Sequence, residues 1–217
     1  MPPRQRASPA PGRHGSWNPW TWVVSTRFLI VGLGNPGQEY LCTRHNAGFM
    51  LADALAERWG GRWPSERKFF SQLAEVTVGT RRGWLCKPQT YMNNSGDAVG
   101  AVRGFHKVPA ENMLVMVDDA DLPLGHLRMK PSGGTGGHHG LESIDKVLGD
   151  GRYPRLRLGI AQPQQRGRDI AGHVLGRVAQ GEREGFDKVL GRATEQAECW
   201  LREGIAQAMN RYNGPVA

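Results

Sequence analysis

The order of apolar and polar residues predicts strands and helices that alternate along the chain. Residues 28–31, Phe-Leu-Ile-Val, form a short apolar run that stops at Gly32, which is typical of a buried central strand. Apolar residues then recur at helical spacing over about 47–59, and Gly60-Gly61 indicates the end of that helix. The folded part of the chain is therefore expected to begin with a strand, a loop and a helix.

Further strands and helices are expected along the rest of the chain. Further strands are expected at 72–78, 84–87, 113–117, 127–130 and 156–160, and a hairpin over 79–83 joins the first two of them. Helices are expected after the capping residues 93–95, at about 141–148, and along 186–209, where apolar residues lie three, four and seven positions apart. The pattern predicts an α/β fold in which helices cover a mixed sheet.

The first 25 residues differ from those that follow. They contain five Pro, three Arg and three Trp but no acidic residue. We expect a disordered, basic, Pro-rich extension over 1–25 and a domain over 26–213. The composition is similar in part to an organellar transit peptide, but the prolines oppose the amphipathic helix of such peptides. An over-extended reading frame and tryptophans that stack on bases are further alternatives.

Charge and cysteine content narrow the function class. The chain has 217 residues, the size of one domain, and its 28 Lys+Arg against 20 Asp+Glu give a net charge of +8. This surplus favours a polyanionic partner, above all nucleic acid, although a generally basic surface is also possible. Cys42, Cys86 and Cys199 form no Cys-x-x-Cys pair, which suits a reducing cytosol. No apolar run approaches the ~18 residues of a membrane span.

Residues 32–37, Gly-Leu-Gly-Asn-Pro-Gly, match the dinucleotide-binding pattern G-x-G-x-x-G after a strand. A dinucleotide site needs a helix N-terminus directly afterwards, but Pro36 lacks an N–H and the next helical pattern begins only near Ala47. A nucleotide-dependent oxidoreductase is therefore the weaker alternative. We expect this loop to form a wall around a substrate, with the Asn35 amide as donor and acceptor.

Two segments offer acid–base chemistry. His45 lies where a loop meets a helix and is a candidate general base, although a single histidine is more often structural or exposed. Residues 117–121, Val-Asp-Asp-Ala-Asp, follow an apolar strand, and one carboxylate there could orient an imidazole. The three acids could instead hold a hard cation, but the other oxygen ligands of a calcium loop are missing. Ordinary solvation remains open for Asp119 and Asp121.

Amides and glycines complete the set of candidates. Asn93 precedes a helix, so its side chain either caps that helix or holds water and polarises a carbonyl group. Residues 132–140 contain a glycine-rich loop that allows close backbone approach to a ligand, and they include the adjacent His138 and His139. Two adjacent histidines do not make a metal site without further ligands, so no metal is expected.

Six segments together resemble the bacterial-type peptidyl-tRNA hydrolases in order and approximate spacing. The resemblance extends from about Arg27 to Asn210 and is far more specific than any one segment. The segments are FLIVGLGNPG, TRHNAGF, KPQTYMNNSG, VDDADLPLG, GGTGGHHGLES and RLRLGI.

This resemblance implies a single domain with a twisted mixed β-sheet sandwiched between α-helices. It implies a cytoplasmic, monomeric enzyme without cofactor, metal or obligatory protein partner. The enzyme would hydrolyse the ester between the peptide and the tRNA 3′ end in peptidyl-tRNA from stalled ribosomes, which recycles the tRNA. By resemblance, His45 is the general base, Asp118 rather than Asp119 orients it, and Asn93 positions water or stabilises the oxyanion.

The resemblance also assigns binding residues. Those expected to bind the peptide and ester are Asn35, Tyr40, Met92, His138 and His139. Those expected to bind tRNA are Arg128, Lys130 and Arg157, each of which could equally be a solvated strand residue.

The chain departs from the family at one position. The family usually has Gly-His-Asn-Gly where this chain has Gly-His-His-Gly at 137–140. An imidazole cannot reproduce the paired donor and acceptor of an amide, so we expect weakened or altered substrate binding rather than lost chemistry. A tRNA-binding protein without turnover, similar to chloroplast splicing-factor relatives of the family, is the main alternative. The presence of His45, Asp118 and Asn93 favours the enzyme.

Overall fold

A computed structural model describes residues 27–64, 68–161 and 170–216, and the expected extension over 1–25 lies outside these ranges. The strands are β1 (Phe28–Gly32), β2 (Ser71–Val78), β3 (Arg81–Pro88), β4 (Met113–Pro123), β5 (His126–Lys130), β6 (Arg155–Ala161) and β7 (Gly214–Pro215). The helices are α1 (Ala47–Trp59), α2 (Ser95–His106), α3 (His139–Leu148), α4 (Ile170–Val174), α5 (Arg183–Glu203) and α6 (Ile205–Tyr212).

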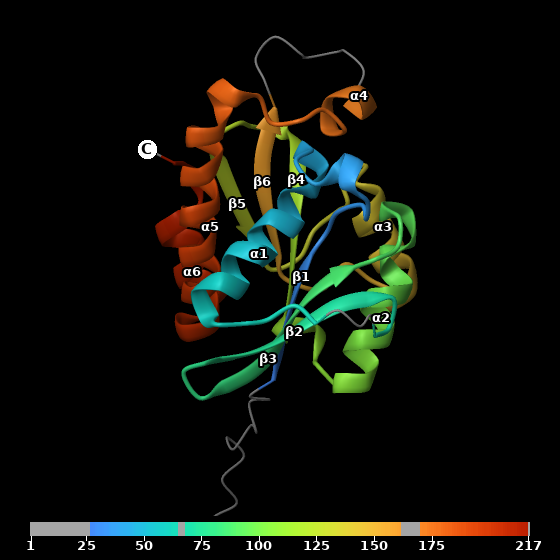
Figure 1. Ribbon diagram of the computed structural model, residues 1–217. Coiled ribbons are helices and arrows are strands. Elements are labelled where there is room, and N and C mark those ends of the chain that lie inside the picture. The colour runs from blue at the N-terminus through green and yellow to red at the C-terminus, as the bar shows by residue number, and fades with distance from the viewer. Residues whose placement is uncertain (1–26, 65–67, 162–169, 217) are drawn as a thin grey trace, which may run out of the picture.

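The described strands form one mixed sheet in the order β2-β3-β1-β4-β6-β5-β7 (Figure 1). The central neighbours β3, β1, β4 and β6 run parallel, whereas β2, β5 and β7 each pair antiparallel with a neighbour. Helices α1, α5 and α6 lie on one side of the sheet and α2 and α3 on the other. The predicted α/β fold with a mixed sheet between helices is confirmed.

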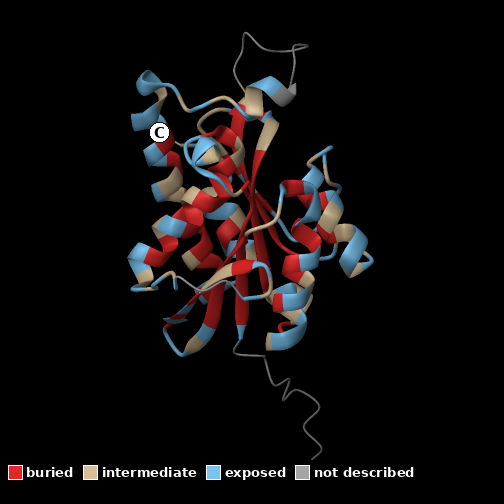
Figure 2. Cartoon of the chain, turned by 45° about the vertical axis from the view of Figure 1, so that its right-hand side comes forward, coloured by how far each residue is buried: buried red, intermediate tan, exposed pale blue. Residues whose placement is uncertain are grey.

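Strand β1 shows why the sheet lies at the centre. Its residues Phe28 and Ile30 belong to the core shared with α1, α5 and α6, while Leu29 and Val31 belong to the core shared with α2 and α3. All four side chains are fully buried, so both faces of the strand are covered. Figure 2 shows the same arrangement as a buried sheet whose flanking helices expose only their outer surfaces.

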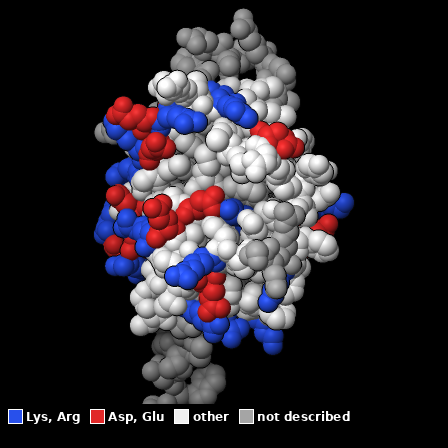
Figure 3. All heavy atoms as spheres, in the orientation of Figure 1, with Lys and Arg blue, Asp and Glu red and all other residues white. Residues whose placement is uncertain are grey.

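Charge is mixed over the helical face that carries α5 and α6. In Figure 3, Lys and Arg side chains alternate there with Asp and Glu side chains, and they do not form one cationic area. Glu198 pairs with both Arg58 and Arg202, and Glu203 pairs with Arg211. Exposed pairs of this kind contribute about 0–1 kcal/mol each, so this face is solvated rather than specialised.

Several elements differ from the sequence-based expectation. Strand β4 continues beyond Val117 to Pro123, so the predicted carboxylate Asp118 lies inside a strand rather than after it. The long C-terminal pattern divides into α5 and α6 at Gly204, whose φ of 89° favours glycine. The sheet also extends past the expected domain end at 213, because β7 pairs with β5. Elements as short as α4 and β7 carry too few residues to show a period.

One predicted cap is wrong. Asn94 occupies the N-cap position of α2, but it makes no side-chain capping hydrogen bond. A short 3-10 helix, Met92–Asn94, leads directly into α2 and determines how the chain enters it.

Two glycines hold the start of α1 against the strand ends. A Cβ atom on Gly48 would lie 2.4 Å from both the Leu33 nitrogen and the Met116 oxygen, and one on Gly32 would lie 2.1 Å from the Gly48 oxygen. Only glycine permits such contact with backbone atoms. The chain segment just before α1 is therefore held at the carboxyl end of β1 and beside Met116 within β4.

The three cysteines are free thiols, as their spacing predicts. Cys42 is exposed, whereas Cys86 and Cys199 are buried. Burial raises the pKa of the Cys86 thiol to about 12, although its hydrogen bond with Ser71 acts in the opposite direction. None of the helices in the described ranges combines the length and the apolar character that crossing a membrane requires.

The contact between α2 and α3 gives a testable prediction on two glycines of one helix. A Cβ atom on Gly96 would lie 2.1 Å from the Ser143 oxygen, whereas one on Gly104 would meet nothing within 4 Å. Gly96→Ala should lower the free energy of unfolding by about 1–3 kcal/mol because the helices must separate. Gly104→Ala should raise it by about 0.5–1 kcal/mol because alanine favours helix. Urea unfolding of both variants measures this, and equal changes would contradict the close approach of α2 and α3.

Candidate active site

The site lies at the carboxyl ends of the parallel strands. After β1 the chain turns toward β2 and β3, and after β4 it turns toward β5 and β6, so a crevice opens between the two strand ends. A cavity of about 830 Å³ lies there. Its lining comprises Asn35, His45, Tyr91, Met92, Asn93, Asp118, Asp119, Ala120, Asp121, Gly136, Gly137, His138, His139, Arg157, Val174 and Leu175.

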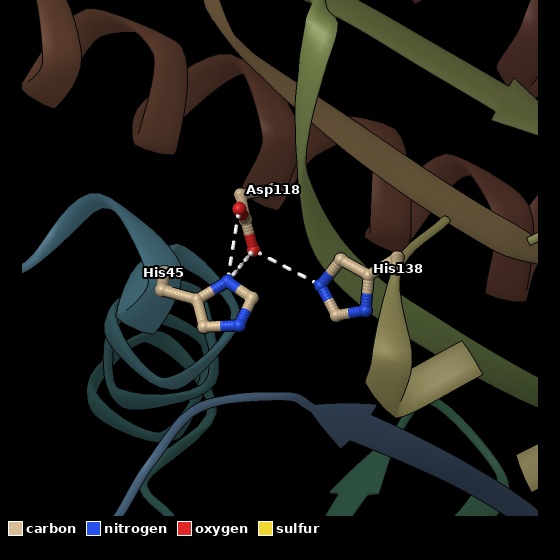
Figure 4. Close-up of side chains that lie close together, drawn as sticks. All are labelled: His45, Asp118 and His138. Carbon is tan, nitrogen blue, oxygen red and sulfur yellow. Dashed lines mark hydrogen bonds and ion pairs between the residues drawn. The ribbon is translucent and has the colours of Figure 1, made fainter. Parts of the chain in front are cut away.

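His45 and Asp118 form the central pair. His45 belongs to a 3-10 turn, Arg44–Asn46, that precedes α1, and its Nδ1 lies 2.9 Å and 3.0 Å from the two carboxylate oxygens of Asp118 (Figure 4). Nδ1–H donates to the carboxylate, since an ionised carboxylate only accepts. The other ring nitrogen, Nε2, is then the unprotonated one and can accept a proton.

His138 contacts the same carboxylate from the other side. Its Nε2 lies 3.1 Å from Asp118 Oδ1, and the two imidazole rings lie 5.1 Å apart between centroids. His138 is the N-cap residue of α3, where the Gly140 N–H donates to its Nδ1 at 3.2 Å. Asp118 therefore accepts hydrogen bonds from two histidines on different elements.

Asp118 is an ionised carboxylate in a buried place. Its side chain is 3% exposed. Burial by itself raises the pKa of Asp118, but hydrogen bonds from His138 and His45 outweigh it and hold the pKa well below its usual range. A fixed negative charge is thus present at neutral pH between the two imidazoles.

His45, Asp118 and His138 also carry the types of atom that bind metal ions. Their ligand atoms lie within 4.8 Å of one another. However, the Gly140 N–H occupies the lone pair of Nδ1 on His138, so the Nε2 that faces the group carries a proton. A protonated nitrogen cannot coordinate a metal. This cluster, within the described part of the chain, does not fit a resident metal ion.

Asp119 and Asp121, the other two acids of this segment, also have surroundings that do not require a bound cation. Asp119 Oδ2 accepts from Arg157 at 3.1 Å, and Asp119 Oδ1 accepts from the backbone N–H groups of Asp121 and Leu122. Asp121 is exposed, in keeping with ordinary solvation.

A relay of amides joins the wall of the cavity to the segment before α1. The buried side chain of Asn46 accepts from the Asn35 N–H at 2.8 Å and donates to the Asn35 carbonyl at 3.0 Å. The side-chain oxygen of Asn35 accepts from the Met92 N–H at 2.8 Å. Asn35 was expected to offer a donor and an acceptor, and one lone pair of its oxygen is already used, so its NH₂ group is the less occupied end for a ligand. Sequence reasoning missed Asn46, because only its burial reveals the role.

Asn93 lies in the 3-10 turn that precedes α2. Its side chain lines the cavity, is exposed, and makes no hydrogen bond with the residues that the structure describes. The amide is therefore free to hold a water molecule or a substrate oxygen.

Two arginines of β6 hold the glycine-rich loop. Arg155 is fully buried and donates to the carbonyl oxygens of Gly133, Gly134 and Gly151 at 2.7–3.1 Å. Arg157 donates to the carbonyl oxygens of Gly134 and Thr135 as well as to Asp119. The loop that ends in His138 is thus fixed by charged hydrogen bonds. Arg155 had no assigned role in the sequence analysis, because a strand arginine carries no local sign of burial.

Three of the expected binding residues do not line the cavity. Tyr40 lies in a separate turn, Gln38–Tyr40. Arg128 and Lys130 are exposed on β5, opposite Arg157 and Arg155 on β6. Cross-strand partners have Cβ atoms about 4.5–5.5 Å apart, so Arg128 lies next to Arg157 at the border of the cavity.

His139 is turned away from the carboxylate. It is the first residue of α3, its side chain is 74% exposed, and its Nδ1 lies 3.0 Å from Glu142 Oε2. It still lines the cavity at the rim.

The last residue of α4 and the residue after it supply an apolar wall that sequence reasoning did not identify. Val174 and Leu175 line the cavity, and Leu175 is exposed. The Arg44 guanidinium binds Glu182 at 2.6 Å, and the Arg44 N–H donates to the Gly176 carbonyl. The residue before His45 therefore holds this wall in place.

Comparisons with known proteins agree with the resemblance seen in the sequence. A family model described as peptidyl-tRNA hydrolase matches residues 29–217. A peptidyl-tRNA hydrolase of Synechococcus sp. is 48% identical over 186 residues, covering 85% of this chain and 82% of that protein. One of Chloroflexus aurantiacus is 49% identical over 187 residues, covering 86% and 98%. The crystal structure of peptidyl-tRNA hydrolase from Acinetobacter baumannii is similar, with a TM-score of 0.80 at 36% identity, covering 87% and 97%.

The buried carboxylate gives a prediction on acid stability. A carboxyl group whose pKa is lower in the folded state contributes stability that is complete above its unfolded pKa, about 3.9, and is lost as pH falls toward the folded value. Asp118→Asn should therefore lower the free energy of unfolding at neutral pH by about 1.5–3 kcal/mol, as expected for lost hydrogen bonds to a charged group. The difference from the parent should shrink as pH falls from about 5 to about 3. Urea unfolding at both pH values measures it, and a constant difference would contradict an ionised Asp118.

Proposed function

The chain belongs to the peptidyl-tRNA hydrolase family and hydrolyses peptidyl-tRNA, and we propose that His45 carries out this reaction as a general base oriented by Asp118. The observation that carries the proposal is the hydrogen bond between His45 Nδ1 and the buried Asp118 carboxylate inside the cavity. It leaves His45 Nε2 as the nitrogen that can take a proton from water.

The reaction then proceeds by attack of water on the ester carbonyl. His45 Nε2 removes a proton while the water oxygen bonds to the carbonyl carbon. The tetrahedral intermediate collapses by breaking the bond to the ribose 3′ oxygen, which takes the proton back from His45. Asp118 remains ionised and stabilises the imidazolium that forms in between. General base catalysis of this kind contributes about 10²–10⁴-fold in rate.

Neutral amides suit the charge that develops on the carbonyl oxygen. Asn35 and Asn93 line the cavity, and their NH₂ groups have no hydrogen-bond partner among the described residues, so they are available to donate to the oxyanion or to hold the attacking water. One donor of this type is worth about 2.7–4 kcal/mol in the transition state. We assign the oxyanion or water-positioning role to Asn93, since neither the oxygen nor the NH₂ group of its side chain has a hydrogen-bond partner among the described residues.

The substrate has an apolar peptide part and a polyanionic tRNA part. Met92 and Leu175 give the cavity an apolar surface for the peptide, with His138 and His139 at its border and Tyr40 farther away. Arg128 and Lys130 are exposed and lie along β5 beyond the cavity, which suits contact with tRNA phosphates. Arg157 contributes positive charge there, although its guanidinium is largely occupied by Asp119 and the glycine-rich loop.

We further propose a cytoplasmic monomer that needs no cofactor or obligatory protein partner and whose domain occupies about 26–213, with β7 adding a short strand at its end. Three free cysteines support a reducing compartment, and translation there supplies the substrate, released from stalled ribosomes. Its tRNA would then be recycled.

The first prediction of this proposal concerns His45. With N-acetylated aminoacyl-tRNA as substrate, His45→Ala should lower kcat/KM by about 10²–10⁴-fold because no other base is placed at the carbonyl. Release of labelled acyl groups measures this, and free aminoacyl-tRNA serves as a substrate control. His106→Ala is the matched control, since His106 ends α2 outside the cavity and away from β5, and it should leave kcat/KM unchanged. A parent that binds tRNA without cleaving it would favour the tRNA-binding alternative.

The second prediction concerns the departure at position 139. His139→Asn should lower KM several-fold, by about 1 kcal/mol of binding, because an amide supplies a donor and an acceptor that the imidazole cannot supply together. The rate constant kcat should change little, since His139 does not contact His45 or Asp118 in the described structure. Steady-state kinetics of the parent, His139→Asn and His139→Ala decide the matter. The same KM for all three proteins would dismiss a binding role for this position.

A further inference from the structure

Asp118 is fixed by donors from two separate elements. His45 approaches both of its oxygens from the segment before α1, and His138 approaches Oδ1 from the start of α3. Both imidazoles are largely buried, with side-chain exposures of 13% and 7%. With His45 alone, the carboxylate could rotate about its terminal torsion, because that torsion is broad. The second donor selects one orientation.

The backbone of α3 determines which nitrogen of His138 carries the proton. The Gly140 N–H is one of the free donors of the first helical turn, and it points at Nδ1 of His138. A backbone N–H can only donate, so Nδ1 must be an acceptor and Nε2 must carry the hydrogen. A second proton on the ring would place two N–H groups against each other. His138 is therefore held as a neutral donor and cannot serve as an alternative base.

The packing around Gly140 makes this arrangement specific. A Cβ atom on Gly140 would lie 2.6 Å from Met92 Sδ, 2.7 Å from Leu33 Cδ1 and 3.1 Å from His138 Cε1. A side chain at position 140 would therefore force Met92 and Leu33 to shift and would crowd the His138 ring.

We propose that His138 is a positioning residue for hydrolysis, which acts through Asp118: its locked Nε2–H fixes the carboxylate toward His45 and takes up part of the carboxylate's hydrogen-bonding capacity. This proposal rests on the proposed role of His45. In this proposal, His138 acts through its hydrogen bond to Asp118 and not only through contact with the peptide.

The proposal has a consequence for the pH dependence of the reaction. The charged and titratable residues that line the cavity together with His45 are Tyr91 before α2, Asp118, Asp119 and Asp121 on β4, His138 and His139 at α3, and Arg157 on β6. Among the residues that the structure describes, only Asp118 forms a hydrogen bond with the His45 ring. Without the His138 donor, Asp118 would attract the proton on His45 more strongly, and the base would stay protonated up to a higher pH.

The kinetic test compares His138→Ala with His138→Gln. Glutamine carries an NH₂ donor at a reach similar to Nε2, whereas alanine carries none. His138→Ala should lower kcat about 10- to 100-fold with KM within about threefold, as expected when a hydrogen bond to a charged group is lost. The acid-side midpoint of the kcat/KM profile should move up by about half a pH unit or more. His138→Gln should recover most of both changes.

Two kinetic results would overturn the proposal. A raised KM with unchanged kcat and an unchanged acid-side midpoint would show that His138 only binds substrate. The same holds if glutamine performs no better than alanine, because the donor to Asp118 would then be irrelevant.

A second measurement requires no hydrolysis. Among the seven histidines of the labelled parent, nitrogen NMR should show the His138 ring with Nε2 protonated and Nδ1 bare, and the His45 ring with the opposite tautomer. Loss of the corresponding signal in His138→Gln, or in His45→Ala, assigns each ring. An Nδ1–H tautomer at His138 overturns the proposal even if hydrolysis is normal. If instead both tautomers are as stated but His45→Ala retains activity, the fault lies in the proposed function.

Discussion

The close backbone contact of Gly48 with Leu33 after β1 and with Met116 inside β4 determines the rest of the site. His45 lies three residues before Gly48, and Asp118 lies two residues after Met116, whose carbonyl touches Gly48. Their separation is therefore set by rigid backbone, not by flexible side chains. A Cβ on Gly48 would lie 2.4 Å from backbone atoms of both Leu33 and Met116, so a side chain there would force this backbone apart. Catalytic geometry here depends on packing at sub-ångström tolerance.

Much of the fold and of the site could be predicted from the sequence. The runs at 28–31 and 47–59 gave β1 and α1 with accurate limits, because strand and helix periods are local properties. Asn46 and Arg155 could not be found in this way. Each has partners that only the folded chain brings near, such as Asn35, eleven residues from Asn46, and Gly133, 22 residues from Arg155. The position of Asp118 inside β4 was missed because polar residues end an apolar run without ending the strand.

The site and the protein as a whole use charge differently. The chain carries +8, yet the groups that would contact the ester are neutral amides and imidazoles around a single buried anion. Arg128 and Lys130 carry positive charge outside the cavity, whereas the guanidinium of Arg155 binds carbonyl oxygens of the glycine-rich loop. The cations that attract a polyanion over long distances therefore lie apart from the groups that would act on the uncharged ester. They do not compete with the histidines for the Asp118 carboxylate.

The unequal burial of the three thiols makes the chain suited to site-specific labelling. Cys86 and Cys199 are enclosed, while Cys42 is open to solvent three residues before His45. The Cys42 carbonyl accepts from the Val178 N–H, so its backbone belongs to the wall that borders the cavity. A maleimide fluorophore will attach at Cys42 in the folded wild-type protein, without removal of the other cysteines. Its emission would then report the arrival and departure of tRNA beside the wall in real time.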